Sequence, residues 1–283
     1  MNNIDDISSK VEEALQRLEQ RVKEIEGSID EKVGQIPEMI DRAVGTRSAP
    51  IRDVGGVVTR KFDIADFTGV EISHAFRFEI VKSDSYSVEI SANEKIFDHI
   101  NALKSGDTLK IGMKPHLGIR GNITLEAKIT MPILKSLSLS GASRGTAKGF
   151  SSAEDFKLHL SGASVLEMSI EASKAKIEMT GASKLNGEMK LGDTDIGISG
   201  ASRLDLKGSA NNVVLNASGA SRMELGEFTV NDADIHASGA STIVTNTNGN
   251  LKIELSGASK FEYAGNPSIH DIRVSGASKI RHK

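Results

Sequence analysis

The tetrad Ser140-Gly141-Ala142-Ser143 recurs from the middle of this 283-residue chain to its C-terminus. Seven copies read Ser-Gly-Ala-Ser, and one copy, Thr180 to Ser183, begins with Thr. The intervals between successive copies are 21, 19, 19, 19, 20, 18 and 19 residues. A near-constant period of this length is typical of repeat architectures, in which each copy belongs to one structural unit. The glycines of the eight copies are Gly141, Gly162, Gly181, Gly200, Gly219, Gly239, Gly257 and Gly276.

Aligned on these glycines, the copies form aliphatic columns separated by polar positions. The residue four positions before each glycine is always Leu or Ile, and the residue four positions after it is apolar in every copy except Gly145. This alternation predicts strands on both sides of the tetrad. Stacked turns of a β-solenoid, about 4.8 Å apart, would place equivalent residues above one another. We therefore expect one rung of about 19 residues per tetrad, with a four-bladed propeller as the alternative.

The tetrad is expected to be the corner of each rung. Glycine allows the backbone to turn there, and stacked serine hydroxyls could bond along the solenoid axis. Asn186-Gly187 and Asn248-Gly249 are expected to be turns elsewhere in their rungs. The predicted β-domain spans residues 56–283, with irregular opening rungs at 56–136 and the eight tetrad rungs at 137–283.

The opening part, residues 56–136, also alternates with a period of two but has no repeat of its own. Gly106-Asp107 is expected to be a turn between strands, and Ile96 to Ile100 a short helical turn. We expect this part to begin the same stack and to cover its first rung.

The N-terminal residues follow a different period. Apolar residues recur on average every 3.6 residues, which predicts an amphipathic, coiled-coil-like helix over residues 1–45, followed by a linker at 46–55. The stripe is long and narrow, so we expect homo-oligomerisation through residues 3–44 rather than packing on the β-domain. The stripe consists of Ile4, Ile7, Val11, Leu15, Leu18, Val22, Ile25, Ile29, Val33, Ile36 and Ile40.

Composition excludes several classes of protein. The net charge of −3 argues against a general nucleic-acid binder. The chain has no Cys, so it has no disulfides and no thiolate metal sites. No apolar run is long enough to span a membrane, and the acidic N-terminus does not resemble a signal peptide, so we expect a cytoplasmic protein.

Residues 51–283 resemble the GIN-domain family, whose members are described as head domains of auto-transporter adhesins. The resemblance is carried by Phe67 to Ile72, Gly106 to Ile111, Met131 to Leu137 and the repeated tetrad. It implies a right-handed, single-stranded parallel β-helix. It implies no catalytic residues, and it implies relatives that are often exported, unlike the location expected here.

A basic column follows the corners at the third position after each glycine. Acidic residues two positions further on would lie beside it. The column could bind an anion, or it could be an ordinary solvated face in which the acids offset the repulsion between the bases. Its members are Arg144, Lys184, Arg203, Arg222, Lys260 and Lys279.

No pattern predicts a catalytic, metal or cofactor site. His159 and His236 share one column position but lie four rungs apart, too far to share a metal. Acids do align, as Glu178 with Glu254 and Asp205 with Glu224. A tetrad that recurs eight times, however, is typical of a structural repeat rather than of one active site. We therefore expect a non-enzymatic, adhesin-head-like structural or interaction protein without cofactors. The alternatives are a carbohydrate-active or carbohydrate-binding β-helix, disfavoured by the scarcity of aromatic platforms, and a filament-forming scaffold. The expected partners are a second copy and a protein or glycan.

Overall fold

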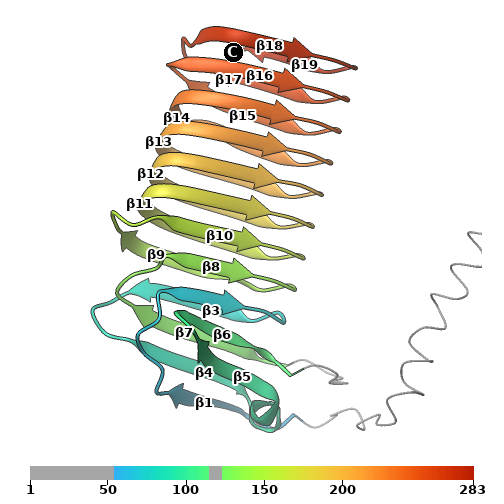
Figure 1. Cartoon of the computed structure of the whole chain (residues 1–283). Coiled ribbons are helices and arrows are strands. Elements are labelled where there is room, and N and C mark those ends of the chain that lie inside the picture. The colour runs from blue at the N-terminus through green and yellow to red at the C-terminus, as the bar shows by residue number, and fades with distance from the viewer. Residues whose placement is uncertain (1–53, 115–122) are drawn as a thin grey trace, which may run out of the picture. The chain divides into compact units, whose positions relative to one another are not determined.

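The computed structural model describes residues 54–114 and 123–283, and in it every tetrad joins two strands (Figure 1). In the middle of the repeat, one long strand runs from each corner to the next. The strands from the first tetrad to the last are β8 (Ser136–Leu139), β9 (Arg144–Ser151), β10 (Phe156–Leu160), β11 (Val165–Met179), β12 (Lys184–Ile198), β13 (Arg203–Ala217), β14 (Arg222–Ala237), β15 (Thr242–Thr247), β16 (Asn250–Leu255), β17 (Lys260–Ala264), β18 (Ser268–Val274) and β19 (Lys279–His282).

These strands pair in parallel with the strands one period away. Ile177 of β11 pairs with Ile196 of β12, which pairs in turn with Leu215 of β13. The described domain is thus an all-β solenoid of about eight turns, as the column pattern predicts. The right-handed sense of the coil stays a prediction.

The corners share one backbone geometry. Their glycines have φ between 68° and 74°, a left-handed conformation that side chains with a Cβ rarely adopt. From the second corner on, the amide N–H that follows each glycine donates to the glycine carbonyl of the rung before it, as from Ala182 to Gly162 at 2.7 Å. A Cβ on Gly200 would overlap the carbonyl oxygen of Gly181, so the backbones stack too closely for any other residue.

The second serine of each tetrad faces inward, and in four of the eight copies its hydroxyl bonds to the carbonyl of the residue that begins its own tetrad. Ser183 Oγ donates to the carbonyl of Thr180 at 2.7 Å, and Ser164 does the same toward Ser161 at 2.8 Å. A hydroxyl-to-hydroxyl bond along the axis joins Ser241 and Ser259, at 3.3 Å. The expectation of stacked serine bonds was therefore only partly right, because a carbonyl three residues away is the nearer acceptor.

The aliphatic columns form the core between the two faces of the solenoid. The seven members from Leu137 to Ile253 that lie four positions before the corner glycines are at most 2% exposed, whereas the eighth, Ile272, is 50% exposed. Gly145 departs from its column because Phe78 already fills the space, with ring atoms 2.7 Å from where a Cβ would lie.

The opening part adds a rung that the tetrad pattern does not reveal. Strand β2 (Gly69–Ile72) pairs in parallel with β8, and β3 (Arg77–Lys82) pairs with β9. The residues between them, Ser73 to Phe76, form a corner in which His74 and Ala75 take the positive φ angles, 64° and 63°.

Below this rung the pairing becomes mixed. Strands β6 (Thr108–Met113) and β7 (Leu125–Met131) pair in parallel with β2 and β3. Strand β5 (Ile100–Ser105) then adds antiparallel to β6, and β4 (Ser87–Asn93) and β1 (Val57–Phe62) add antiparallel beyond β7. The 3₁₀ helix η1 (Glu94–His99) joins β4 to β5 and buries Ile96 and Phe97.

Of the predicted turns, Gly106-Asp107 and Asn248-Gly249 do interrupt strands, and the short helical turn is η1. The turn expected at Asn186-Gly187 was wrong. Both residues lie inside β12 and pair with Asp205 and Leu206 of β13. Further along β12, a Cβ on Gly192 would overlap the carbonyl oxygen of Ser173, so two rungs approach closely there.

The predicted helix over residues 1–45 and most of the linker lie outside the described residues. Within residues 54–114 and 123–283, no helix has the length and apolar content needed to cross a membrane.

Candidate functional site

A groove of about 500 Å³ lies on the face of the solenoid that leads into the corners. Two outward columns line it: equivalent residues of the first pair from rung to rung, and those of the second hold the same position at successive corners. The first, which we call the polar column, consists of His159, Glu178, Gly197, Asn216, His236 and Glu254. The second, the hydroxyl column, consists of Thr180, Ser199, Ser218, Ser238 and Ser256.

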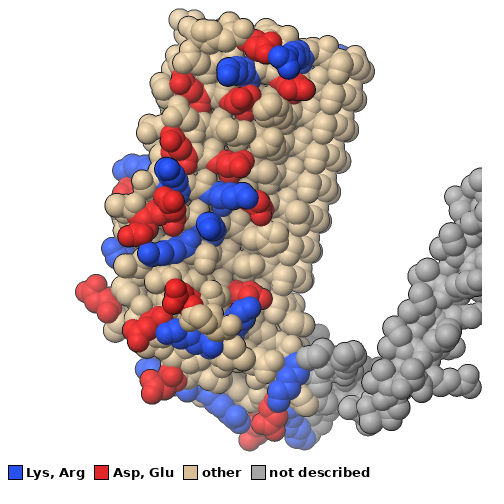
Figure 2. All heavy atoms as spheres, in the orientation of Figure 1, with Lys and Arg blue, Asp and Glu red and all other residues tan. Residues whose placement is uncertain are grey.

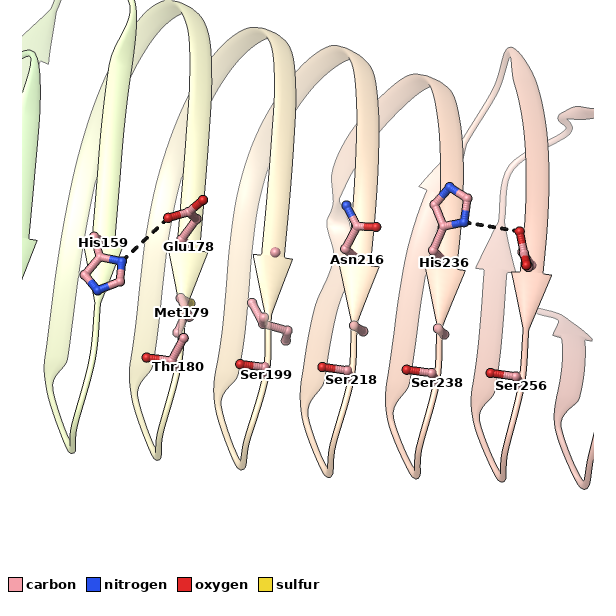
Figure 3. A pocket seen from close by; sticks show the side chains of 15 residues that line it. His159, Glu178, Met179, Thr180, Ser199, Asn216, Ser218, His236, Ser238 and Ser256 are labelled. Carbon is pink, nitrogen blue, oxygen red and sulfur yellow. Dashed lines mark ion pairs between the residues drawn. The ribbon is translucent and has the colours of Figure 1, made fainter.

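Strand periodicity accounts for both columns. Residues one and three positions before each corner glycine point outward, because those two and four positions before it point into the core. The floor is accordingly made by buried side chains such as Met179, Ile198 and Ala217. Figure 3 shows the hydroxyls of Thr180, Ser199, Ser218, Ser238 and Ser256 in one row along the axis.

The polar column is interrupted at Gly197. A Cβ at this position would meet no atom within 4 Å, so the glycine leaves a notch in the column. The side chains of Glu178 and Asn216, one rung to either side, flank the notch. Glu178 and Asn216 are thus two rung spacings apart, which corresponds to about 10 Å.

Each histidine of the polar column faces a carboxylate of the next rung. His159 Nδ1 lies 3.7 Å from Glu178 Oε2, and His236 Nδ1 lies 3.6 Å from Glu254 Oε2. The other nitrogen of His236, Nε2, lies 3.1 Å from Asp234 Oδ1. These side chains are 40% to 57% exposed, so water screens the pairs and they contribute little to stability.

Glu178 is also held from its own strand. The ammonium of Lys176 donates a hydrogen bond to it at 2.7 Å, and this bond lowers the pKa of the Glu178 carboxyl below its usual value. Burial opposes the shift, while the charges of Lys176 and His159 support it. The carboxylate is therefore ionised at neutral pH and can accept hydrogen bonds from a ligand.

The structure separates the two histidines as the sequence predicts. His159 lies on β10 and His236 on β14, with three rungs between them. Among the described residues, no group of three or more His, Asp or Glu side chains is placed to hold a metal ion.

The predicted anion-facing column lies elsewhere on the solenoid. Its six residues are exposed and begin the strands that follow the corners. One of them, Arg222, forms an ion pair with Glu224 of its own strand. Figure 2 shows acidic and basic side chains interspersed on the face it presents. Anion binding by this column stays a prediction.

Sequence reasoning named four members of the polar column, His159, His236, Glu178 and Glu254, but not as one site. It missed the notch at Gly197 and the amide of Asn216. The available signal was the single glycine in an otherwise polar column.

The model of the family described as "Putative auto-transporter adhesin, head GIN domain" matches residues 66–267. The chain belongs to this family. The match includes the opening rung, seven tetrads and the whole groove. The curated proteins include no relative that matches this chain.

Solved structures share the fold of this GIN-domain chain at low identity. A "putative lipid binding protein" from Parabacteroides distasonis is 17% identical, with a TM-score of 0.75. The match covers 83% of this chain and 100% of the chain of that protein. A "putative adhesin" from Parabacteroides merdae has the same identity and coverage and a TM-score of 0.74. A "putative adhesin" from Bacteroides fragilis is 16% identical, with a TM-score of 0.64. The match covers 81% of this chain and 97% of the chain of that protein. At these identities the likeness concerns the fold alone.

Proposed function

We propose that this protein is a non-enzymatic binding head that uses the solenoid to present the groove and self-associates through residues 3–44. The observation that carries the first half is the groove itself. Its polar groups repeat from rung to rung on a rigid sheet, which suits contact with an extended partner. Its histidine–carboxylate pairs are exposed, whereas catalytic acids and bases are usually placed where burial tunes their pKa. Membership of an adhesin-head family supports the same reading.

Self-association would give such a head its avidity. A shallow, exposed groove binds weakly, and joining several heads multiplies the effective affinity without any new contact. The support for this step is the apolar stripe between Ile4 and Ile40 in the sequence. A location in the cytoplasm remains part of the proposal, and fractionation of cells that express the full chain would test it.

Light scattering on the full chain and on a chain beginning at Ile51 tests the self-association. We expect an oligomer for the full chain and a monomer for the shorter one. Ile25→Asp places a charge in the stripe and should also give a monomer, whereas Gln20→Asp, on the polar side, should leave the oligomer intact. Equal masses for the full and shortened chains would contradict the proposal, and large concentration-dependent masses for both would favour the filament alternative.

A further inference from the structure

The groove differs chemically from the charged surfaces around it. None of its lining residues is Lys or Arg, whereas the groove around Gly187 on another face is lined by Lys148, Lys184 and Lys207 with their acidic partners. The carboxylates of Glu178 and Glu254 face the groove and would repel a phosphate, a sulfate or a uronate. An anionic ligand is therefore a poor fit.

The groove also does not suit an acyl chain or an added peptide strand. The apolar floor residues Met179, Ile198, Ala217 and Ala237 are at most 4% exposed, so they offer an acyl chain little surface to cover. The strands that carry the groove pair with neighbours on both sides, so the groove has no free backbone edge on which a peptide strand could add.

What the groove does offer is a dense set of neutral and accepting hydrogen-bond groups. The carboxylate of Glu178 has lone pairs beyond the one that Lys176 uses and can accept hydroxyl donors, and the amide of Asn216 can both donate and accept. Along the hydroxyl column, one further hydroxyl follows at each rung, about every 4.8 Å. This spacing is comparable to the length of one sugar residue in an extended glycan. The volume lies within the ordinary range of small-molecule sites, about 300–1,000 Å³.

We propose that the groove binds a neutral glycan lying along the solenoid axis, with one sugar ring seated over Gly197 between Glu178 and Asn216. The proposal rests on the proposed binding function and names its ligand class. The groove lacks an aromatic side chain on which a sugar could stack. The affinity of one groove is accordingly weak, with a Kd on the order of 1 mM, and avidity through self-association becomes useful.

Titration calorimetry of the full chain with neutral cello-, manno-, xylo- and chito-oligosaccharides of increasing length tests the proposal. We expect at least one series to bind, with affinity rising with length until the chain fills the groove and then levelling off. Gly197→Gln places a side chain in the notch, where a Cβ meets nothing, and should weaken binding at least tenfold without unfolding the protein. The matched control is Gly226→Gln, outside the groove, where the nearest atom to a Cβ lies 3.8 Å away and binding should be unchanged.

Three outcomes would overturn the assignment. The first is no binding of any neutral series, and the second is binding that Gly197→Gln leaves intact. The third is Gly197-dependent binding of a polyuronate or of phosphatidylglycerol vesicles in place of the neutral glycans. These failures are distinguishable from failure of the proposed self-association, because the latter is measured by mass without any ligand.

Discussion

The two ends of the solenoid finish the same stack in different ways. At the N-terminal end the chain reverses direction, adds β1, β4 and β5 as antiparallel strands, and buries Ile96 and Phe97 of η1. At the C-terminal end the last rung, β18 and β19, continues the parallel stack with one register shift in β18, and in the described structure each strand has one neighbour. Ile269, Ile272 and Val274 are 41%, 50% and 47% exposed there.

The difference shows what a repeat can and cannot provide. Each inner rung covers the core of its neighbour, so the last rung of any regular stack leaves its own core residues half covered. An ending that buries them needs a sequence that departs from the repeat, as residues 56–136 do. The C-terminal end instead carries charges along its edge, including Lys279 and Arg281, which oppose pairing with another strand.

The largest effect should come from replacing a corner glycine in the middle of the stack. Gly200→Ala forces a left-handed conformation on alanine and pushes its Cβ against the carbonyl oxygen of Gly181. We expect a loss of at least about 3 kcal/mol in the free energy of unfolding, measured by urea denaturation. Gly276→Ala makes the same clash in the last rung, which can detach locally, so it should cost only about 1 kcal/mol. Equal losses at the two positions would show that the last rung is as firmly held as the middle.

Much of the middle of the solenoid was predictable from its sequence. The tetrads and their flanking columns identified the rungs. Because the rungs stack on one another, each corner and each core position requires the same type of residue in every rung. At Gly200 the demand is for a positive φ and for room beside the carbonyl of Gly181, which glycine alone meets.

The opening rungs could not be predicted in the same way. The strands that pair in these rungs lie at unequal distances along the chain. The corner there is formed by His74 and Ala75, residue types that do not predict a positive φ. The groove was missed for a related reason. The groove depends on the absence of a side chain at Gly197. A repeat pattern draws attention to residues that recur, and Gly197 is the position at which the polar column does not recur.

The next largest difference in the free energy of unfolding should be between substitutions at the buried N-terminal end and at the exposed C-terminal end of the solenoid. Ile96→Ala removes a side chain that is 0% exposed and should cost about 3 kcal/mol. Ile272→Ala removes the same atoms from a side chain that is 50% exposed and should cost less than about 1.5 kcal/mol. Chemical denaturation with a common slope measures both changes. A cost at Ile272 as large as that at Ile96 would mean that the C-terminal rung is covered in solution.

The charges at the open edge should affect association more than stability. Replacing both Lys279 and Arg281 by Thr removes the repulsion along β19 and should allow end-to-end pairing, seen as masses that grow with protein concentration, while stability changes by less than about 0.5 kcal/mol. The control removes the same charge from inner rungs by replacing Lys184 and Arg203 by Thr, and its mass should match that of the unaltered chain. The measurement uses the chain beginning at Ile51, so that residues 3–44 do not contribute. Identical masses for both double variants would show that the basic edge does not limit association.

The smallest effect concerns a ladder of polar groups that ties the last rung to its neighbours. Asp232 accepts hydrogen bonds from the backbone N–H of Asn250, at 2.7 Å, and from its side chain, and Asn250 Oδ1 lies 2.7 Å from His270 Nε2 of the last rung. The bond from the Asn250 backbone is the main cause that lowers the pKa of Asp232 below its ordinary value, with the Asn250 side chain next.

Because the folded-state pKa of Asp232 is the lower one, its contribution to stability is present above the unfolded pKa of about 3.9 and is lost as the pH falls through the folded value. Asp232→Asn should therefore lower the urea midpoint at neutral pH, and the difference from the unaltered chain should shrink to nothing in strong acid. Since the ladder reaches His270, amide exchange in β18 should quicken in the variant at neutral pH, while exchange around Ile96 at the closed end should not change. A midpoint difference that persists below the folded pKa would mean that Asp232 stabilises the rung by packing rather than by its charge.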